Sequence, residues 1–250
     1  QWSGKQIIPA AYVLQATRNQ TSSSGGHYGY CWFINDRREL LPSAPEDAYF
    51  HVGNGKESRR TVLAVVPSLD LVAVVGTHAG KFDITQGYTS IPVLQVNEWI
   101  GRIVECISSV DGKDFPFPSA TPEQAGMNQA KLEQARQYAQ TGGGSGCIIR
   151  GGRLVMAWGD QKQKYDIYSS TKSIGVTALG LAIMDGKVQL HDKAKKHLSS
   201  VGTPPKDNAH SGWLDELTFW HLATQTGGFE KTRGWCRQAN RPGTTWMYSD

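Results

Sequence analysis

The chain has 250 residues, of which 39% are hydrophobic and 19% charged, and its formal net charge at pH 7 is +4. This length can bury a sizeable core, and the balanced composition excludes a disordered or fibrous protein. Lysines and arginines are interspersed with acids and form no basic stripe, so we expect no nucleic-acid partner. No apolar run approaches the roughly 20 residues of a membrane span, so we expect a soluble chain with no membrane partner.

The first third of the chain predicts a helix, a loop and a strand. Residues 5–20 have the composition of a short helix that is entered at Pro9, where a proline is well tolerated. The polar, glycine-bearing stretch 21–27 predicts a loop. The aromatic-rich stretch YGYCWFIN, residues 28–35, is a strand candidate.

Residues 60–77 predict the clearest strand pair. Two runs rich in valine flank the turn PSLD at 67–70, which indicates two antiparallel strands. After them, apolar residues recur at helical spacing over 93–107, so we expect an amphipathic helix there. The stretch 108–126 is rich in serine, proline and glycine and predicts a linker at the surface.

Beyond this stretch the sequence predicts three helices and a hairpin. Residues 128–140 predict a polar helix, and Gly151-Gly152 between two apolar runs at 147–159 is typical of a β-hairpin. Residues 174–188 are apolar on every face, which predicts a central buried helix. Residues 213–228 predict a further helix, halted by two glycines. Together these patterns favour an α/β protein of the α+β type, with one sheet covered by helices.

The cysteines give no sign of a metal site. The four of them lie far apart, without a CxxC spacing or a histidine cluster, at Cys31, Cys106, Cys147 and Cys236. Zinc sites need such close spacing, so we expect no metal. Buried free thiols and, in an exported protein, disulfides both stay open.

The stretch YDIYSSTKSIG, residues 165–175, places Ser169 three residues before Lys172 at the start of the apolar helix. Residues three apart lie on one helix face, so the lysine amine can reach the serine hydroxyl. A desolvated, neutral lysine can act as the base for a serine nucleophile, and the helix start favours the alkoxide. The stretch alone also fits a serine N-cap followed by a solvated lysine.

Two other stretches point to the catalytic alternative. With SSTK, the stretches AYFHVGNG (48–55) and RPGTTWMYSD (241–250) resemble the three signature elements of the serine β-lactamase and penicillin-binding-protein superfamily. The resemblance is closest to its class C β-lactamase and esterase branch, which includes 6-aminohexanoate-dimer-hydrolase-like enzymes. Flanking segments, among them LATQTGGFE at 222–230, are similar too. The resemblance implies a β-lactamase/transpeptidase-like fold, with an antiparallel sheet flanked by helices.

By this resemblance, Ser169 is the nucleophile, and Lys172 and Tyr248 move the proton. The triplet HVG, which begins at His51, and Asp250 of the triplet YSD correspond to substrate-binding elements.

The resemblance also implies an oxyanion hole and a small-molecule ester, amide or β-lactam substrate. Gly53 would let the substrate approach the strand, and the backbone N–H groups of Asn54 and Ser169 would form the oxyanion hole. No metal or organic cofactor is implied. The resemblance allows an exported, periplasmic or secreted location.

The order of the segments departs from that of the family. Residues 1–107 resemble the family's C-terminal half, 127–250 resemble its N-terminal half with the nucleophile helix, and 108–126 link them. This order is that of a circular permutation, in which both halves form one domain. The helical middle region of the family has no counterpart here, so it is either deleted or supplied by a second chain.

Two substitutions in the motifs bear on the chemistry. Asp250 stands where the family has asparagine, and a carboxylate there favours a protonated Lys172, which leaves Tyr248 as the proton relay. His51 stands where other members have lysine, and a neutral imidazole is a poorer anchor for a β-lactam carboxylate.

We therefore expect a serine hydrolase that acts on a carboxylic ester or amide through an acyl-enzyme. The alternatives are a β-lactamase or penicillin-binding enzyme, and a permuted or truncated chain that folds and binds a ligand without turnover.

Overall fold

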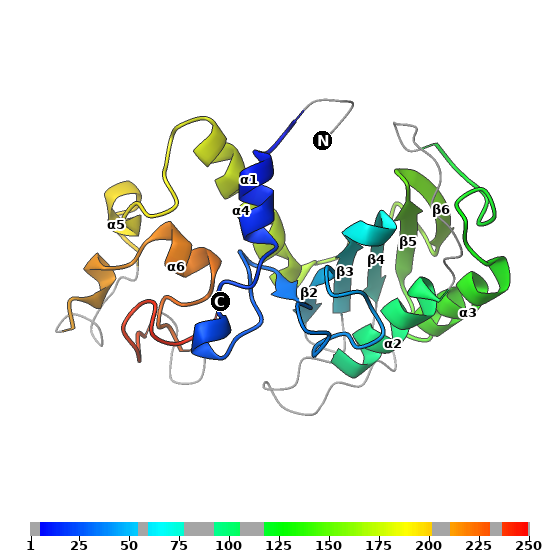
Figure 1. Cartoon of the computed structure of the whole chain (residues 1–250), viewed down its shortest axis with the longest axis horizontal. Coiled ribbons are helices and arrows are strands. Elements are labelled where there is room, and N and C mark those ends of the chain that lie inside the picture. Colours follow the sequence, from blue (N-terminus) through cyan, green and yellow to red (C-terminus); the bar gives the residue numbers. More distant parts are fainter. Residues whose placement is uncertain are drawn as a thin grey trace. The chain divides into compact units, whose positions relative to one another are not determined.

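A computed structural model describes residues 6–54, 60–77, 93–105, 118–201, 211–230 and 237–249. The chain forms two compact units, each of which is described by itself. We call Ile34–Thr171 the sheet unit, and Gln1–Phe33 together with Lys172–Asp250 the helical unit. Figure 1 shows their elements.

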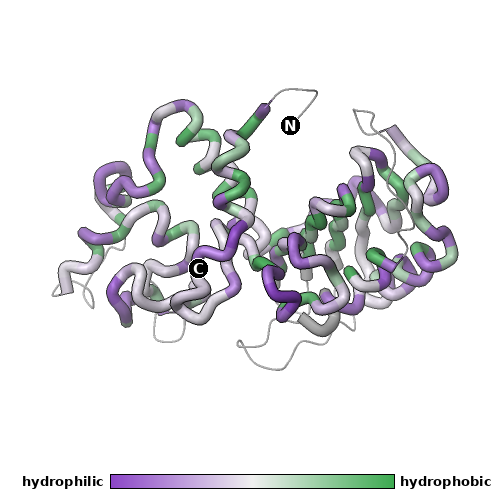
Figure 2. Tube along the Cα trace, in the orientation of Figure 1, coloured by the Kyte–Doolittle hydropathy of each residue, from purple (hydrophilic) through white to green (hydrophobic). Residues whose placement is uncertain are grey.

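A six-stranded antiparallel sheet follows the order of the chain, which confirms the predicted fold class. Its strands are β1 (Phe33–Ile34), β2 (Tyr49–Asn54), β3 (Arg60–Val66), β4 (Leu71–Thr77), β5 (Ser145–Arg150) and β6 (Arg153–Trp158). Strands β3 and β4 are the predicted pair, and their valine-rich runs alternate between buried and half-buried residues. Figure 2 shows hydrophobic residues along these strands. The pairing of β4 with β5, with Ala73 opposite Ile148, joins segments from both sides of the expected linker.

Two helices of the sheet unit, each predicted by the sequence, lie side by side (Figure 1). They are α2 (Val93–Val104) and α3 (Gln129–Gln140), and Asn128 caps α3 through its side chain. The Tyr138 hydroxyl donates to a Glu98 carboxylate oxygen across the pair at 3.0 Å. The Arg102 guanidinium lies 5.1 Å from the centroid of the Tyr138 ring.

The apolar faces of these two helices are buried. Their fully or almost fully buried residues are Trp99, Ile100, Ile103, Leu132, Ala135 and Ala139. The helical spacing of the apolar residues in α2 explains why the sequence predicts that helix. Helix α2 ends earlier than predicted, and residues 106–107 lie outside the described residues.

The predicted hairpin is the β5–β6 turn, in which Gly151 and Gly152 both have positive φ, 58° and 68°. The end of the predicted linker is more ordered than its composition indicates. Residue Ser119 forms a parallel bridge with Leu154 of β6. The Arg150 guanidinium donates to the backbone carbonyls of Ala125 and Gly126. The bridge and the Arg150 side chain hold residues 119–126 to the sheet, and residues 106–117 lie outside the described residues.

The helical unit contains α1 (Ala10–Ala16), α4 (Thr171–Met184, which starts at the last residue of the sheet unit), α5 (Ala194–His197) and α6 (Phe219–Ala223). Helix α1 begins after Pro9, as predicted. It contacts α4 closely, because the Tyr12 hydroxyl donates to the Val176 carbonyl at 2.7 Å (Figure 1). Gly180 permits this contact, since a Cβ there would lie 2.6 Å from the Tyr12 ring.

The prediction that α4 is buried on every face is wrong. Ser173, Val176 and Gly180 form its buried side, whereas Ile174 and Met184 are 56% and 46% exposed. A uniformly apolar composition therefore predicts the helix but not the burial of all its faces.

Two further predictions in this unit are wrong. In the predicted strand 28–35, only Phe33–Ile34 is extended, because Cys31 has a positive φ of 52° and the chain turns back there. The predicted helix 213–228 is split into a short 3-10 turn (Trp213–Asp215) and α6. The split occurs because Thr218 is an N-cap that starts a new helix, with its side chain accepting from the His221 backbone N–H.

Within the described ranges, no helix has both the length and the apolar character to cross a membrane. Cys31 is buried and Cys147 is half-buried, and both are free thiols. The other two cysteines lie outside the described residues.

Candidate active site

Ser169 lies in a tight 3-10 turn, Tyr168–Ser170, that leads directly into α4. The turn is closed by a hydrogen bond from the Ser170 N–H to the Ile167 carbonyl at 3.0 Å. Tyr168 has a φ of 45°, a left-handed conformation that is rare for a bulky residue and concentrates at functional sites. Ser169 itself is half-buried. The predicted nucleophile therefore lies on a strained turn at the start of a helix.

Two strands of the sheet unit contact this turn. At the end of β2, a Cβ on Gly53 would lie 2.1 Å from the Ile167 carbonyl oxygen, so only glycine fits. On β3, the Thr61 hydroxyl donates to the same carbonyl at 3.0 Å and lies 3.0 Å from the Ser170 hydroxyl. The structure thus brings the predicted HVG strand next to the turn that carries Ser169. Asn54 is the last residue of β2.

The His51 side chain is fully buried within β2. Its Nδ1 lies 3.1 Å from the Val52 carbonyl oxygen. A substrate could contact this ring only after the strand rearranged, so the role predicted for His51 stays a prediction.

Lys172 and Tyr248 meet in the helical unit. The Lys172 ammonium lies 5.0 Å from the centroid of the Tyr248 ring, in a cation–π arrangement that favours the protonated amine. The Tyr248 ring also stacks on Phe33, with 6.0 Å between centroids, and meets Tyr28 edge-on at 6.2 Å. Both predicted proton-transfer residues are half-buried and held by aromatic packing.

The segment around Tyr248 is fixed by Gln225, a residue that sequence reasoning missed. The Gln225 side-chain oxygen accepts from the Ser249 N–H at 2.7 Å, and its backbone carbonyl accepts from the Met247 N–H at 3.0 Å. Gln225 has a φ of 58°. Its one signal in the sequence is its place in the stretch LATQTGGFE, which the family resemblance includes. Asp250, predicted to touch substrate, lies outside the described residues.

Cys31 is a second nucleophilic residue near Lys172 that the sequence did not indicate. Burial raises the pKa of its thiol to about 12, although the nearby Lys172 and a hydrogen bond with Tyr28 act in the opposite direction. Its Sγ donates to the Ala223 carbonyl at 3.4 Å, and its own carbonyl accepts from the Ser173 hydroxyl at 2.7 Å. The thiol is therefore protonated and structural, and it does not compete with the serine as nucleophile.

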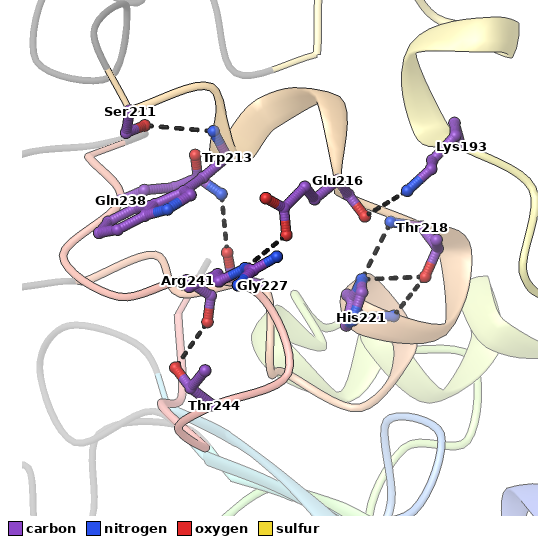
Figure 3. Close-up of polar contacts among 10 residues, drawn as sticks. All are labelled: Lys193, Ser211, Trp213, Glu216, Thr218, His221, Gly227, Gln238, Arg241 and Thr244. Atoms are coloured by element: carbon purple, nitrogen blue, oxygen red, sulfur yellow. Dashed lines mark hydrogen bonds and ion pairs between the residues drawn. The ribbon is translucent and has the colours of Figure 1, made fainter.

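A polar network orders the loops that lead to Tyr248 (Figure 3). Arg241 pairs with Glu216 at 2.7 Å, and Lys193 donates to the Glu216 carbonyl at 3.2 Å. The His221 Nδ1 lies 3.1 Å from the Thr218 N–H and accepts from it, so the ring is neutral. Burial, and secondarily the charges of Lys193 and His191, lower the pKa of His221.

Among the described residues, no group of three or more histidine, cysteine, aspartate or glutamate side chains could hold a metal ion. In comparisons with known proteins, residues 129–250 match the protein-family model described as Beta-lactamase. This match includes Ser169, Lys172 and Tyr248. No curated protein and no solved structure matched the chain.

Proposed function

We infer, from the match of residues 129–250 to the Beta-lactamase family model, that the chain hydrolyses a carboxylic ester or amide through an acyl-enzyme on Ser169. This family belongs to the serine β-lactamase and penicillin-binding-protein superfamily. The observation that carries the proposal is the turn of Ser169. A strained residue precedes the serine, a helix of 14 residues follows it, and the end of β2 contacts the turn.

In the proposed reaction, the Ser169 oxygen attacks the substrate carbonyl and its proton passes to the leaving group through Tyr248, with the Lys172 ammonium beside it. Water then attacks the acyl-enzyme, takes its acyl group and returns a proton to the serine. The N-terminus of α4 favours the negative charge that develops on the serine oxygen. We assign the oxyanion hole to the backbone N–H groups of Ser169 and Asn54, because β2 ends beside the turn.

The contact between Lys172 and Tyr248 supports a particular division of roles. The Lys172 ammonium lies over the face of the Tyr248 ring, so we assign Tyr248 as the proton acceptor and Lys172 as the charged group beside it. This division agrees with the carboxylate that Asp250 contributes to the same triplet.

We also propose that the chain is a circular permutation of the family's order, with 1–107 and 127–250 as the exchanged halves around the linker 108–126. The pairing of β4 with β5 and the packing of α2 against α3 support this, because each contact joins the two halves.

A β-lactamase or penicillin-binding activity is the second candidate, and the family description favours it. The buried His51, where other members have lysine, disfavours it because the substrate carboxylate would meet no lysine ammonium there. A chain that binds ligands without turnover is the third outcome.

The test is hydrolysis of a p-nitrophenyl ester and of a chromogenic cephalosporin by the parent chain, by Ser169→Ala and by Ser200→Ala as a matched serine control. Ester turnover that is lost only in Ser169→Ala supports the esterase. Cephalosporin turnover supports the β-lactamase. Equal activity of the Ser169→Ala variant and the parent would overturn the proposal.

A further inference from the structure

We propose that Thr61 is a positioning residue for Ser169. The Thr61 hydroxyl holds the nucleophile turn on both sides of the serine. This inference rests on the proposed function. Thr61 does not touch the substrate, and its role is to fix the direction in which Ser169 presents its oxygen.

The hydrogen bonds of Thr61 flank Ser169 in the sequence. The Thr61 hydroxyl donates to the carbonyl of Ile167, two residues before the serine, at 3.0 Å. It lies 3.0 Å from the hydroxyl of Ser170, the residue after the serine. A threonine hydroxyl has one proton, which goes to the carbonyl, so the Ser170 hydroxyl donates to Thr61.

Burial makes these bonds hard to replace. Thr61 is 7% exposed and Ser170 is 5% exposed. Water therefore has little access to the Ser170 hydroxyl, which would lose this partner if the Thr61 hydroxyl were removed. The Ile167 carbonyl already accepts from the Ser170 N–H, so Thr61 supplies its second hydrogen bond.

The hydrogen bonds of Thr61 hold a turn that contains the strained residue Tyr168. Tyr168 has a φ of 45° and lies between Ile167 and Ser170, the two residues that Thr61 contacts. Such a conformation persists only where the surroundings enforce it. Threonine is common in strands for its shape alone, which is the plainer explanation of this residue. Shape alone does not account for a buried hydroxyl that is directed at the turn on both sides of the serine.

The test compares Thr61→Val, which keeps the shape, with Thr61→Ser, which keeps the hydroxyl. Because a misplacement of about 1 Å can cost roughly 100-fold in rate, we expect Thr61→Val to lower kcat and the rate of labelling by a fluorophosphonate by roughly 100-fold, with a small change in KM. Thr61→Ser should recover most of both rates. The control is Thr141→Val, which removes an exposed threonine bond to the Tyr138 carbonyl in the same unit and should leave both rates unchanged.

A second readout does not depend on activity. Hydrogen–deuterium exchange of the peptide 165–172 should be at least about tenfold faster in Thr61→Val than in the parent, because the turn loses its anchor, and unchanged in Thr141→Val. Unchanged exchange, or equal losses in Thr61→Val and Thr61→Ser, would overturn the inference. A parent chain that is neither labelled nor active would instead overturn the proposed function, while faster exchange in Thr61→Val alone would still support the anchoring of the turn.

Discussion

Replacing Gly53 by alanine tests the contact between β2 and the nucleophile turn. The new Cβ would lie 2.1 Å from the Ile167 carbonyl oxygen and 2.4 Å from the Thr61 hydroxyl. The threonine side chain can rotate, but a backbone carbonyl cannot move without the turn. Because real Cβ contacts essentially never fall under 3.0 Å, the carbonyl must retreat by about 0.9 Å.

The expected loss follows from this displacement. Overpacking of this kind typically costs about 1–3 kcal/mol of stability. A shift of about 1 Å in the turn should lower kcat roughly 100-fold. The assay is ester hydrolysis together with urea unfolding of the same preparation, so that loss of rate and loss of folded protein are separated.

Gly175→Ala is the matched control, since a Cβ there would meet nothing within 4 Å. Gly175 lies inside α4, so alanine should leave kcat unchanged and add up to about 1 kcal/mol of stability. Parent-like rate and stability in Gly53→Ala would show that β2 does not press on the turn.

Three other variants test further parts of the account. Burial lowers the pKa of His221, so the folded state favours the neutral ring. The stability that the neutral ring contributes is fully present above about pH 6.5 and is lost as the pH falls through the lowered pKa. In thermal unfolding, His221→Gln should therefore show a smaller loss of stability at acidic pH than the parent. Asp250→Asn removes a negative charge from the triplet of Tyr248, so the pH–rate profile should move to lower pH. Superimposable profiles of the parent and the variant would show that Asp250 does not control the base. Trp99→Ala, at a site only 2% exposed, should cost about 3–5 kcal/mol in urea unfolding, whereas Leu14→Ala, 67% exposed, should cost little.

Local patterns were sufficient for much of the sheet unit. Strands β3 and β4 follow from their valine-rich runs, and the hairpin follows from Gly151-Gly152, because both signals come from residues close together in the sequence. The helical periodicity of α2 likewise predicts the face that it buries. The predicted domain organisation stays a prediction.

The failures occur where a single residue changes the backbone or where distant segments meet. The positive φ of Cys31 ends a strand that its aromatic neighbours favour, and the cap at Thr218 divides an apolar run into two elements. Thr61 contacts a segment far along the chain, so no local pattern could reveal its role. In contrast, the motifs that carry Ser169 and Tyr248 are short and contiguous, which is why sequence alone suggests them.

The most direct test of the account is the position of the covalent adduct. After incubation with a fluorophosphonate, the parent chain should gain the mass of one adduct, and trypsin should place it on YDIYSSTK, residues 165–172. Fragment ions should assign it to Ser169, because the proposal makes this serine the only activated one. An adduct on Ser170 or on a serine outside this peptide, or none at all, would contradict the account.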